Sequence, residues 1–495
     1  MSDVETGEIT TDIPGRLDRL PWAAWHWLVV VGLGTVWILD GLEVTIVGSM
    51  SSALKPDGSG LGMNNWDIGF AGAIYVAGAC LGALFWGQMT DRFGRKKLFM
   101  ITLGVYLVGT VLTAFSMNPM WYFACRFITG TGIGGEYAAI NSAIDELIPA
   151  KYRGRVDIAI NGSFWVGAAG GALLTVLLLD KSIIPAEVGW RLAFGLGALL
   201  ALGVLFVRRS VPESPRWLFI HGREDEADQV VRDIEEHVSR STGEDLPHVE
   251  DTITVRQRRT IPLWEIARTV AAQYPKRTVL CFSLFVGQAF LYNAFFFTYG
   301  DTLTTFLNVG QTGWYIAVFA ASNFLGALVL SPLFDRLGRV KMIAGTYILS
   351  GVLLAVAGFA LGGLTAVTLT IMGAVVFFFA SAGASAAYLT ASEVFPMETR
   401  ALCIAFFYAI GTAVGGITGP LLFGALIDHA SASGDITAIA SGYFLGAVLM
   451  IGGGLVEAFL GVKAEQRPLE QIAKPLTATD GGSPQTQRPV TATAR

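Results

Sequence analysis

The sequence predicts an all-α membrane protein with twelve transmembrane helices in two similar six-helix bundles. Two observations lead to this fold class. Of the 495 residues, 53% are apolar and only 15% are charged, whereas soluble domains carry about 25% charged residues. The apolar residues also form blocks of about 20 residues, the length at which a helix crosses about 30 Å of hydrocarbon. The net charge of −5 gives no reason to expect a nucleic-acid partner.

Each block is long enough to cross the membrane, and none alternates apolar and polar residues as the strands of a membrane barrel do. The abundance of glycine, 59 residues in all, suits close helix packing in lipid. In chain order, the expected transmembrane helices span residues 25–49, 66–87, 98–116, 119–142, 157–179, 190–208, 278–300, 312–333, 341–361, 364–391, 402–427 and 437–461.

A long polar segment and a polar tail complete the predicted organisation. Residues 224–238 place apolar side chains at helical spacing, which predicts an amphipathic helix beneath the bundle. Residues 464–495 are rich in Thr, Pro and Gln, and we expect them to be disordered. The expected parts are a cytoplasmic N-terminal tail (1–21), an N-terminal six-helix bundle (22–208), a cytoplasmic linker (209–275), a C-terminal six-helix bundle (276–463) and a disordered cytoplasmic tail (464–495).

A short repeat supports the division into two halves. Residues 91–95 read DRFGR and residues 335–339 read DRLGR, while a Glu-x2-Pro-x3-Arg run beginning at Glu146 recurs at Glu393 with nearly the same offset. Repeated halves are typical of secondary transporters. Lys and Arg are concentrated in the loops on one side of the predicted bundle, so we expect that side and both termini to lie in the cytoplasm, beneath the plasma membrane.

Three motifs resemble those of the major facilitator superfamily. Residues 87–97 (GQMTDRFGRKK) resemble its loop 2–3 signature, and the run from Arg126 to Glu136 resembles its helix-4 motif. Residues 212–218 (PESPRWL) resemble the signature of the sugar-porter-like branch, which also includes organic-ion, aromatic-acid and synaptic-vesicle-type transporters. The resemblance covers about residues 22–463. It implies the major facilitator fold, with a central cavity between the halves, and secondary active transport by alternating access.

Two acids and one arginine lie inside the predicted transmembrane helices. Asp40 and Glu43 are three residues apart and share a face of the first helix. Glu43 and Arg126 both lie about 10 Å from the outer ends of their helices, so they can form a pair. A carboxylate that alternates between an arginine and a proton acts as a switch. The resemblance implies a proton-coupling role for Asp40, Glu43 and Arg126; alternatively, one of the two acids, Asp40 more readily than Glu43, only caps or hydrates the outer cavity.

The candidate substrate-binding residues match the sugar-porter pattern only in part. Gln288 and Asn293 keep the helix-7 spacing of that pattern, Asn161 stands where sugar porters carry Gln, and Tyr388 stands where they carry Trp. Trp165 completes this candidate site. Because half of the sugar pattern is missing, a small organic acid is favoured over a sugar or polyol. A drug or metabolite:proton antiporter and an uncoupled facilitator remain the alternatives.

Charged pairs on the cytoplasmic side form the predicted gate. The pairs that we expect to bridge helices while this side is closed are Asp91 with Arg92, Glu146 with Arg153, Asp335 with Arg336, and Glu393 with Arg400. The candidate gating and motif residues are Gly87, Asp91, Arg92, Gly94, Arg95, Glu136, Glu146, Arg153, Glu213, Arg216, Asp335, Arg336, Arg339, Glu393 and Arg400.

The sequence gives no indication of an enzyme, a cofactor or a metal. The four cysteines are scattered over separate helices, and no His or Cys cluster, nucleophile motif or phosphate-binding loop is present. The expected partners are a small-molecule substrate, protons and membrane lipid, and we expect the chain to act as a monomer.

Overall fold

The computed structural model describes residues 8–50, 54, 61–63, 65–180, 182–208, 212–249, 252–256, 268, 270, 272–309, 312–396 and 399–473. The helices of its first half are α2 (Ala24–Ser49), α3 (Asn65–Phe93), α4 (Arg95–Ala114), α5 (Pro119–Leu147), α6 (Arg153–Gly162), α7 (Phe164–Leu178) and α8 (Ala186–Arg208). Those of its second half are α12 (Pro275–Leu307), α13 (Gly313–Arg336), α14 (Arg339–Ala360), η2 (Leu361–Gly363), α15 (Ala366–Glu393), α16 (Arg400–Gly411), η3 (Thr412–Gly416), α17 (Ile417–Ser433), η4 (Ile436–Ile439) and α18 (Ala440–Leu460).

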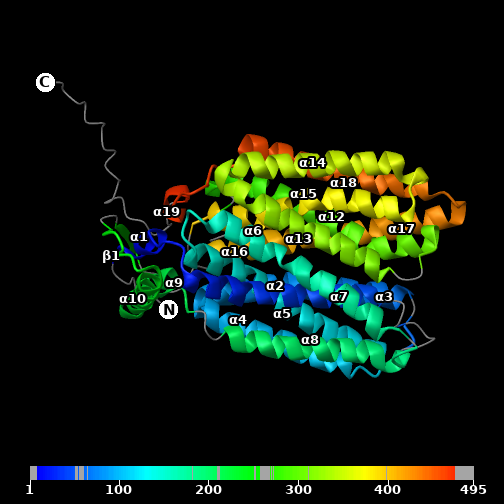
Figure 1. Cartoon of the computed structure of the whole chain (residues 1–495), viewed down its shortest axis with the longest axis horizontal. Coiled ribbons are helices and arrows are strands. Elements are labelled where there is room, and N and C mark those ends of the chain that lie inside the picture. Colours follow the sequence, from blue (N-terminus) through cyan, green and yellow to red (C-terminus); the bar gives the residue numbers. More distant parts are fainter. Residues whose placement is uncertain are drawn as a thin grey trace.

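Each predicted transmembrane block corresponds to one long helix or to a pair of consecutive helices (Figure 1). In the described part of the chain, eleven spans are long and apolar enough to cross a membrane by length and composition. The further long helix of the bundle, α5, carries Arg126, Glu136, Asp145 and Glu146, which make it more polar than the others. It packs along α3 and α4 inside the first half. The predicted fold class, two bundles of transmembrane helices, is therefore confirmed.

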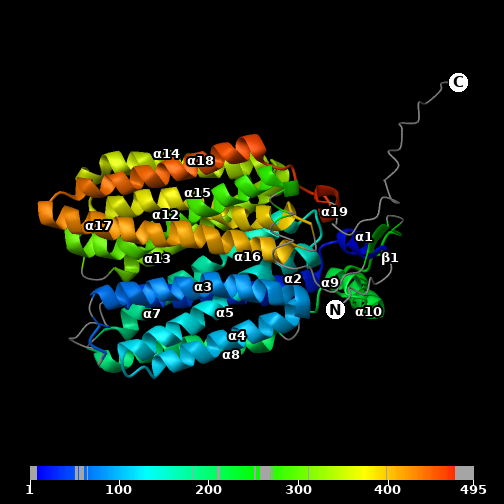
Figure 2. The ribbon, with the colours of Figure 1, turned by 180° about the vertical axis from the view of Figure 1, so that it is seen from behind.

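The two halves lie side by side along their length (Figures 1 and 2). They meet where α3 packs against α16 and where α7 packs against α13. Small residues permit this approach: a Cβ added at Gly87 would lie 2.7 Å from the Cβ of Ala405, and one at Gly313 would lie 2.7 Å from Val176. Gly87 of the loop 2–3 motif therefore serves the contact between the halves.

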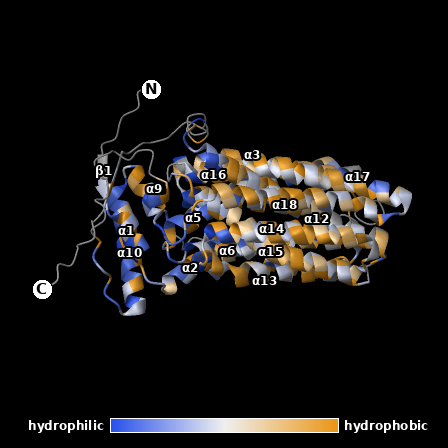
Figure 3. Ribbon diagram, turned by 90° about the horizontal axis from the view of Figure 1, so that it is seen from above, coloured by the Kyte–Doolittle hydropathy of each residue, from blue (hydrophilic) through white to orange (hydrophobic). Residues whose placement is uncertain are grey.

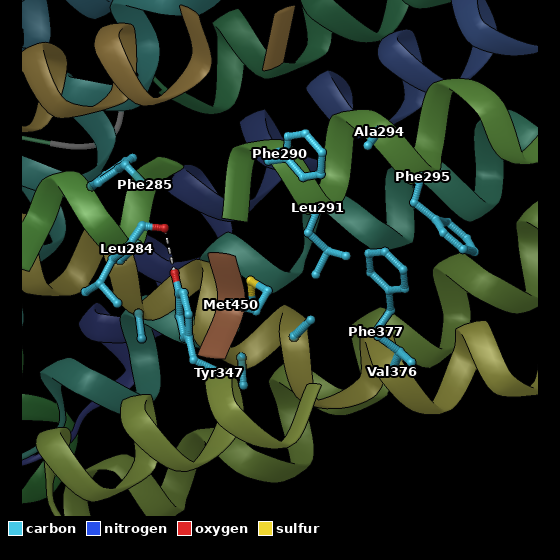
Figure 4. Close-up of a cluster of buried hydrophobic side chains, with 14 of the residues drawn as sticks. Leu284, Phe285, Phe290, Leu291, Ala294, Phe295, Tyr347, Val376, Phe377 and Met450 are labelled. Atoms are coloured by element: carbon cyan, nitrogen blue, oxygen red, sulfur yellow. Dashed lines mark hydrogen bonds between the residues drawn. The ribbon is translucent and has the colours of Figure 1, made fainter. Parts of the chain in front are cut away.

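The core of the second half is built largely from α12, α15 and α16, and Figure 4 shows the part where α12 meets α14 and α15. The rings of Phe295 and Phe377 lie 4.8 Å apart, and the buried hydroxyl of Tyr347 donates to the carbonyl of Leu284 at 2.9 Å. This packing fixes the rotation of α12, and with it the face of α12 that is left for the interface with the first half.

Short helices and one amphipathic helix cover one end of the bundle, which we call the linker face (Figure 3). They are α1 (Ile13–Asp18), α9 (Pro215–Ile220), α10 (Glu224–Thr242) and α19 (Leu469–Ile472), and beside them β1 (Glu8–Thr11) pairs antiparallel with β2 (Ile253–Arg256). The amphipathic helix predicted at 224–238 is present as α10. Its Ala227, Val231, Ile234 and Val238 are buried against α1 and α9.

The start of the predicted disordered tail is ordered instead. Residues 461–473 run along the linker face, where Gln466 donates to the carbonyl of Asp335 at 3.0 Å and Glu470 accepts from Arg216 at 3.0 Å. The polar residues of this segment form hydrogen bonds with the bundle, and the sequence pattern does not reveal these contacts. Residues 474–495 lie outside the described residues.

Arg16 of α1 and Arg19, which follows α1, hold the N-terminal segment against α10. Arg16 donates to both carboxylate oxygens of Glu235, at 3.0 and 2.6 Å, and Arg19 bonds the same carboxylate. Burial opposes ionisation of Glu235, but the hydrogen bonds from Arg16 and Arg19 outweigh it and lower the pKa of this carboxyl.

We expect acidification to loosen this contact. Because the pKa of Glu235 is lowered from 4.5 by folding, its stabilisation is complete above that value and is lost as the pH falls through the lowered one. Glu235→Gln should therefore increase hydrogen exchange of residues 13–18 severalfold at pH 7, measured by mass spectrometry. Glu236→Gln is the matched control, since Glu236 is exposed and pairs with exposed Arg240. Equal exchange in the two variants would contradict the prediction.

Candidate functional site

A cavity of about 190 Å³ lies between the two halves. All residues predicted to bind substrate line it: Asn161 from α6, Trp165 from α7, Gln288 and Asn293 from α12, and Tyr388 from α15. The remaining lining residues are Trp37, Val44, Tyr75, Val76, Ala79, Tyr137, Phe164, Ala289, Tyr292, Ser381, Ala384, Ser385, Tyr408 and Thr412. The structure therefore brings together, from both halves, the residues that the sequence places on separate helices.

Several buried polar groups at the cavity are left without a protein partner. Within the described part of the chain, Trp37 Nε1, Tyr75 Oη and Asn161 Oδ1 form no hydrogen bond. The amide nitrogen of Asn161 donates to Asn141 Oδ1 at 3.0 Å, which fixes the orientation of that side chain. Since buried polar groups are normally hydrogen-bonded, the cavity is suited to a ligand that offers both donors and acceptors.

The predicted contact between Glu43 and Arg126 is present. Arg126 Nη1 donates to Glu43 Oε1, and the two side chains are only 1% and 2% exposed. The guanidinium also lies over the ring of Tyr75, with Cζ 4.2 Å from the ring centroid. Because Tyr75 lines the cavity, a single aromatic ring separates the ion pair from the space where a ligand would bind.

Asp40 is linked to the cavity by a hydrogen bond from Tyr137, a second aromatic residue that lines it. Asp40 is 3% exposed, and its Oδ2 accepts a hydrogen bond from the hydroxyl of Tyr137. The ring of Tyr137 stacks on Trp37, with centroids 4.8 Å apart, and both rings line the cavity. Ligand contact with either ring can therefore be transmitted to the carboxylate of Asp40.

At the linker face Asp335 pairs with Arg339 and not with the predicted Arg336, whereas the predicted Asp91–Arg92 pair lies outside the described residues. Arg92 and Arg336 are exposed, because residues one after the motif aspartates point away from the helix contacts. Arg95 binds Glu146 at 2.9 Å, and Arg339 binds Glu393 with two contacts of 3.0 Å. Asp91 lies in the last turn of α3, and its side chain lies outside the described residues.

Charged residues of the two halves meet at the linker face. Arg153 approaches Glu393 at 3.9 Å and Arg400 approaches Glu146 at 3.8 Å, the reverse of the predicted partners. Each arginine therefore approaches the acid of the other half instead of the acid of its own run. Asp335 joins the halves as well, since its Oδ2 accepts from the backbone N–H of Arg155 at 2.9 Å.

The motif glycines and the PESPR motif support this network. Gly94 and Gly338 have φ of 97° and 100°, which favours glycine, and each precedes the helix that begins with the paired arginine. Glu213 accepts from the backbone N–H of Arg95 at 2.9 Å. Burial raises the pKa of Glu213. Arg216 donates to the carbonyl of Glu146 at 2.8 Å.

The profile of the family described as "Sugar (and other) transporter" matches residues 34–475. The chain belongs to this family. The niacin transporter NiaP of Acinetobacter baylyi is 29% identical over 93% of this chain and 99% of its own length. The 4-hydroxybenzoate transporter PcaK of the same species is 26% identical, covering 85% and 90% of the two chains, and the gallate transporter of Pseudomonas putida is 25% identical, covering 84% and 89%.

A solved structure confirms the architecture. The proton:xylose symporter XylE of the major facilitator superfamily superposes with a TM-score of 0.71 at 17% identity, covering 90% of this chain and 98% of that one. The predicted fold and family are thus confirmed, and this protein is a membrane transporter of small organic molecules, not an enzyme. The proton-coupling, substrate-binding and gating roles of individual residues, including Glu136, which is buried on α5, stay predictions.

Sequence reasoning missed part of the site of this transporter. Trp37, Tyr137, Tyr292 and Tyr408 line the cavity but were not predicted to do so. Tyr292 lies four residues after Gln288, on the same face of the helix, so helical spacing could have identified it. Tyr137 follows the motif acid Glu136, but nothing in the sequence indicates that its hydroxyl meets Asp40.

We expect Tyr137→Phe to destabilise this transporter by about 1–3 kcal/mol, because Asp40 would lose its hydrogen bond inside the bundle. The stacking on Trp37 should persist, since the ring is kept. Thermal unfolding of the purified protein measures the loss. Tyr408→Phe is the control: its ring meets Tyr137 edge-on at 4.6 Å, and removing its hydroxyl leaves the Asp40 bond intact. A similar loss in both variants would argue against a specific Asp40–Tyr137 bond.

Proposed function

We propose that this transporter is a proton-coupled symporter of small organic acids that carry a single ring. The observation that supports this most strongly is the buried Glu43–Arg126 pair, which lies one ring away from the cavity between the halves. In this proposal the substrate binds in the cavity, and the two halves rock to open it to one side of the plasma membrane at a time.

The cavity has the size and surface for one aromatic or heterocyclic ring. An apolar cavity of roughly 150 Å³ holds benzene, so about 190 Å³ leaves room for a ring with small substituents. Trp37, Tyr137, Trp165, Tyr292 and Tyr388 offer ring faces and edges for stacking. The amides of Gln288 and Asn293 can donate hydrogen bonds to a carboxylate, and Asn161 Oδ1, whose amide nitrogen already donates to Asn141 and to the carbonyl of Asp157, can accept one from a hydroxyl group.

The charges around the cavity favour coupling to protons. Among the described residues that line it, none is charged, so a bound carboxylate would add a negative charge beside Asp40 and Glu43. A proton taken up by Glu43 cancels that charge and frees Arg126 to attract the substrate. With the proton bound, the substrate-loaded transporter carries one negative charge fewer than without it. This lowers the free-energy cost of the conformational change, in which the charge stays inside the low-dielectric bundle.

The relatives support an acid substrate over a sugar. The names of three of them specify niacin, 4-hydroxybenzoate and gallate, each of which is one ring with a carboxyl group. XylE carries xylose with protons, but at 17% identity it supports the fold only. The incomplete sugar-porter pattern at Gln288, Asn293 and Asn161 points in the same direction.

Uptake into proteoliposomes with an acidic exterior tests the proposal. Radiolabelled nicotinate, 4-hydroxybenzoate, gallate and xylose are compared, with protein-free liposomes and a protonophore as controls. We expect at least one aromatic acid to accumulate and to be released when the protonophore collapses the gradient. Uptake of xylose alone would overturn the substrate class. Uptake that the protonophore does not change would indicate a facilitator, and expulsion driven by the opposite gradient would indicate an antiporter.

A further inference from the structure

Asp157 is a fully buried carboxylate that no motif identifies. It lies on α6, one helical turn from Arg153 and one turn before the cavity residue Asn161. Its relative exposure is 0%, and neither carboxylate oxygen has a hydrogen-bond partner among the described residues. An ionised carboxylate left in this state costs several kcal/mol, so the position requires either a cation or a proton.

The helices around α6 bring acids towards Asp157 rather than a free cation. Asp145 of α5 and Glu393 of α15 both act on it as like charges. The one cation among its main electrostatic neighbours, Arg339, is held by Asp335 at 2.8 Å and by Glu393 at 3.0 Å. The remaining charged or titratable groups on α6 and on the elements packed against it are Arg153 and Arg155 of α6 itself, Tyr122, Cys125, Arg126, Glu136, Tyr137 and Glu146 of α5, Tyr315 and Arg336 of α13, Tyr388 of α15, and His26, Asp40 and Glu43 of α2.

Arg153 does not neutralise Asp157 either. It approaches Asp18 at 3.4 Å, and Asp145 and Glu393 at 3.9 Å each. Across the linker-face network the carboxylates outnumber the arginines. The buried arginines are Arg95, Arg153, Arg216, Arg339 and Arg400, and the carboxylates are Asp18, Asp145, Glu146, Asp157, Asp335, Glu393 and Glu470. Charge balance therefore favours a neutral Asp157 while this face is closed.

The position of Asp157 connects the cavity to the interface between the halves. Asn161 donates to the backbone carbonyl of Asp157 at 2.9 Å and to Asn141 at 3.0 Å. On the other side, a Cβ added at Gly154 would lie 2.2 Å from Arg339 Nη1, so the second half packs directly on this part of α6. Opening of the linker face would withdraw that cover and admit water to Asp157.

We propose that Asp157 is a second proton-binding site of this transporter, occupied while the linker face is closed and emptied when that face opens. On opening, the O–H bond of the protonated carboxyl breaks, its proton passes to an entering water molecule, and the carboxylate is left hydrated. The proposal rests on alternating access from the proposed function but not on coupling at Glu43. It makes the opening of the linker face dependent on pH, with high pH favouring the open state.

The test is the labelling rate of a cysteine placed between the cavity and the linker face. Ala391 is buried on α15 between cavity-lining Tyr388 and Glu393 of the network. Ala391→Cys is introduced after replacement of the native cysteines, and N-ethylmaleimide labelling is followed from pH 5.5 to pH 8.5, normalised to the unfolded protein. We expect the normalised rate to rise severalfold with pH, by at most about tenfold per pH unit for one proton. A flat profile would overturn the proposal.

Two further variants test whether Asp157 or a neighbouring acid binds the proton. Asp157→Asn mimics the protonated form and should label slowly at every pH, whereas Asp145→Asn removes a buried acid that Arg153 approaches and should keep the pH dependence. A rising profile in Asp157→Asn would assign the proton to another group and overturn the proposal. If Asp157→Asn does not fold, the normalised profile of the parent protein decides alone. Glu43→Gln should keep the pH dependence of labelling even though proton coupling of transport is lost. A failure of the proposed function can therefore be distinguished from a failure of the proposal for Asp157.

Discussion

Glu43→Gln is expected to abolish proton-driven accumulation of substrate while counterflow exchange survives. Glutamine has the shape of a protonated glutamate, so the site stays in the state that moves with substrate but cannot release a proton. One proton per substrate supports up to about tenfold accumulation per pH unit, since each unit is worth about 1.4 kcal/mol. The variant should therefore equilibrate substrate without concentrating it, measured in proteoliposomes under an imposed pH gradient.

Asp40→Asn is the matched control for this experiment. Asp40 is as buried as Glu43, but it is held by the hydroxyl of Tyr137 instead of by Arg126. We expect it to change substrate affinity through Tyr137 and to leave accumulation intact. Normal accumulation by Glu43→Gln together with loss in Asp40→Asn would move the coupling role to Asp40.

Arg339→Gln is expected to open the linker face and to destabilise the protein by about 3–5 kcal/mol, the effect of removing one partner of a buried ion pair. Arg339 is 2% exposed and binds both Asp335 and Glu393, which would be left as buried, unpaired acids. Both acids belong to the second half, and they become hydrated when the halves separate and water enters, so the loss of Arg339 favours the open state. Thermal unfolding measures the loss of stability, and labelling at Ala391→Cys measures the opening.

Arg336→Gln provides a stringent control because it changes the same residue type three positions earlier. Arg336 is exposed, and surface charges contribute about 0–1 kcal/mol, so unfolding and labelling should be close to those of the parent protein. The spacing of the motif alone would have assigned the pairing with Asp335 to Arg336. A larger effect of Arg336→Gln than of Arg339→Gln would show that the pairing seen in the structure is not the one that closes the gate.

Much of the candidate site could be predicted because the rise per residue of a helix fixes how far apart two residues lie along the helix axis. The depth match of Glu43 and Arg126 follows from the rise per residue, and the pair is present. The substrate candidates Asn161, Gln288 and Tyr388 follow from family spacing, and they line one cavity. Tyr137 and Asp157 were missed because their importance comes from neighbours on other helices, which no spacing along the chain encodes.

The sequence by itself determined that the chain spans the membrane, where its helices lie, and that it consists of two repeated halves. These properties are set residue by residue, because the cost of placing a polar group in hydrocarbon depends little on distant neighbours. Only the tertiary structure decided which arginine meets which acid. Arg95 meets Glu146 and Arg339 meets Glu393, while Arg92 and Arg336 face outward. The rotation of each helix about its axis selects among these pairings, and that rotation is set by packing between helices that are far apart in sequence.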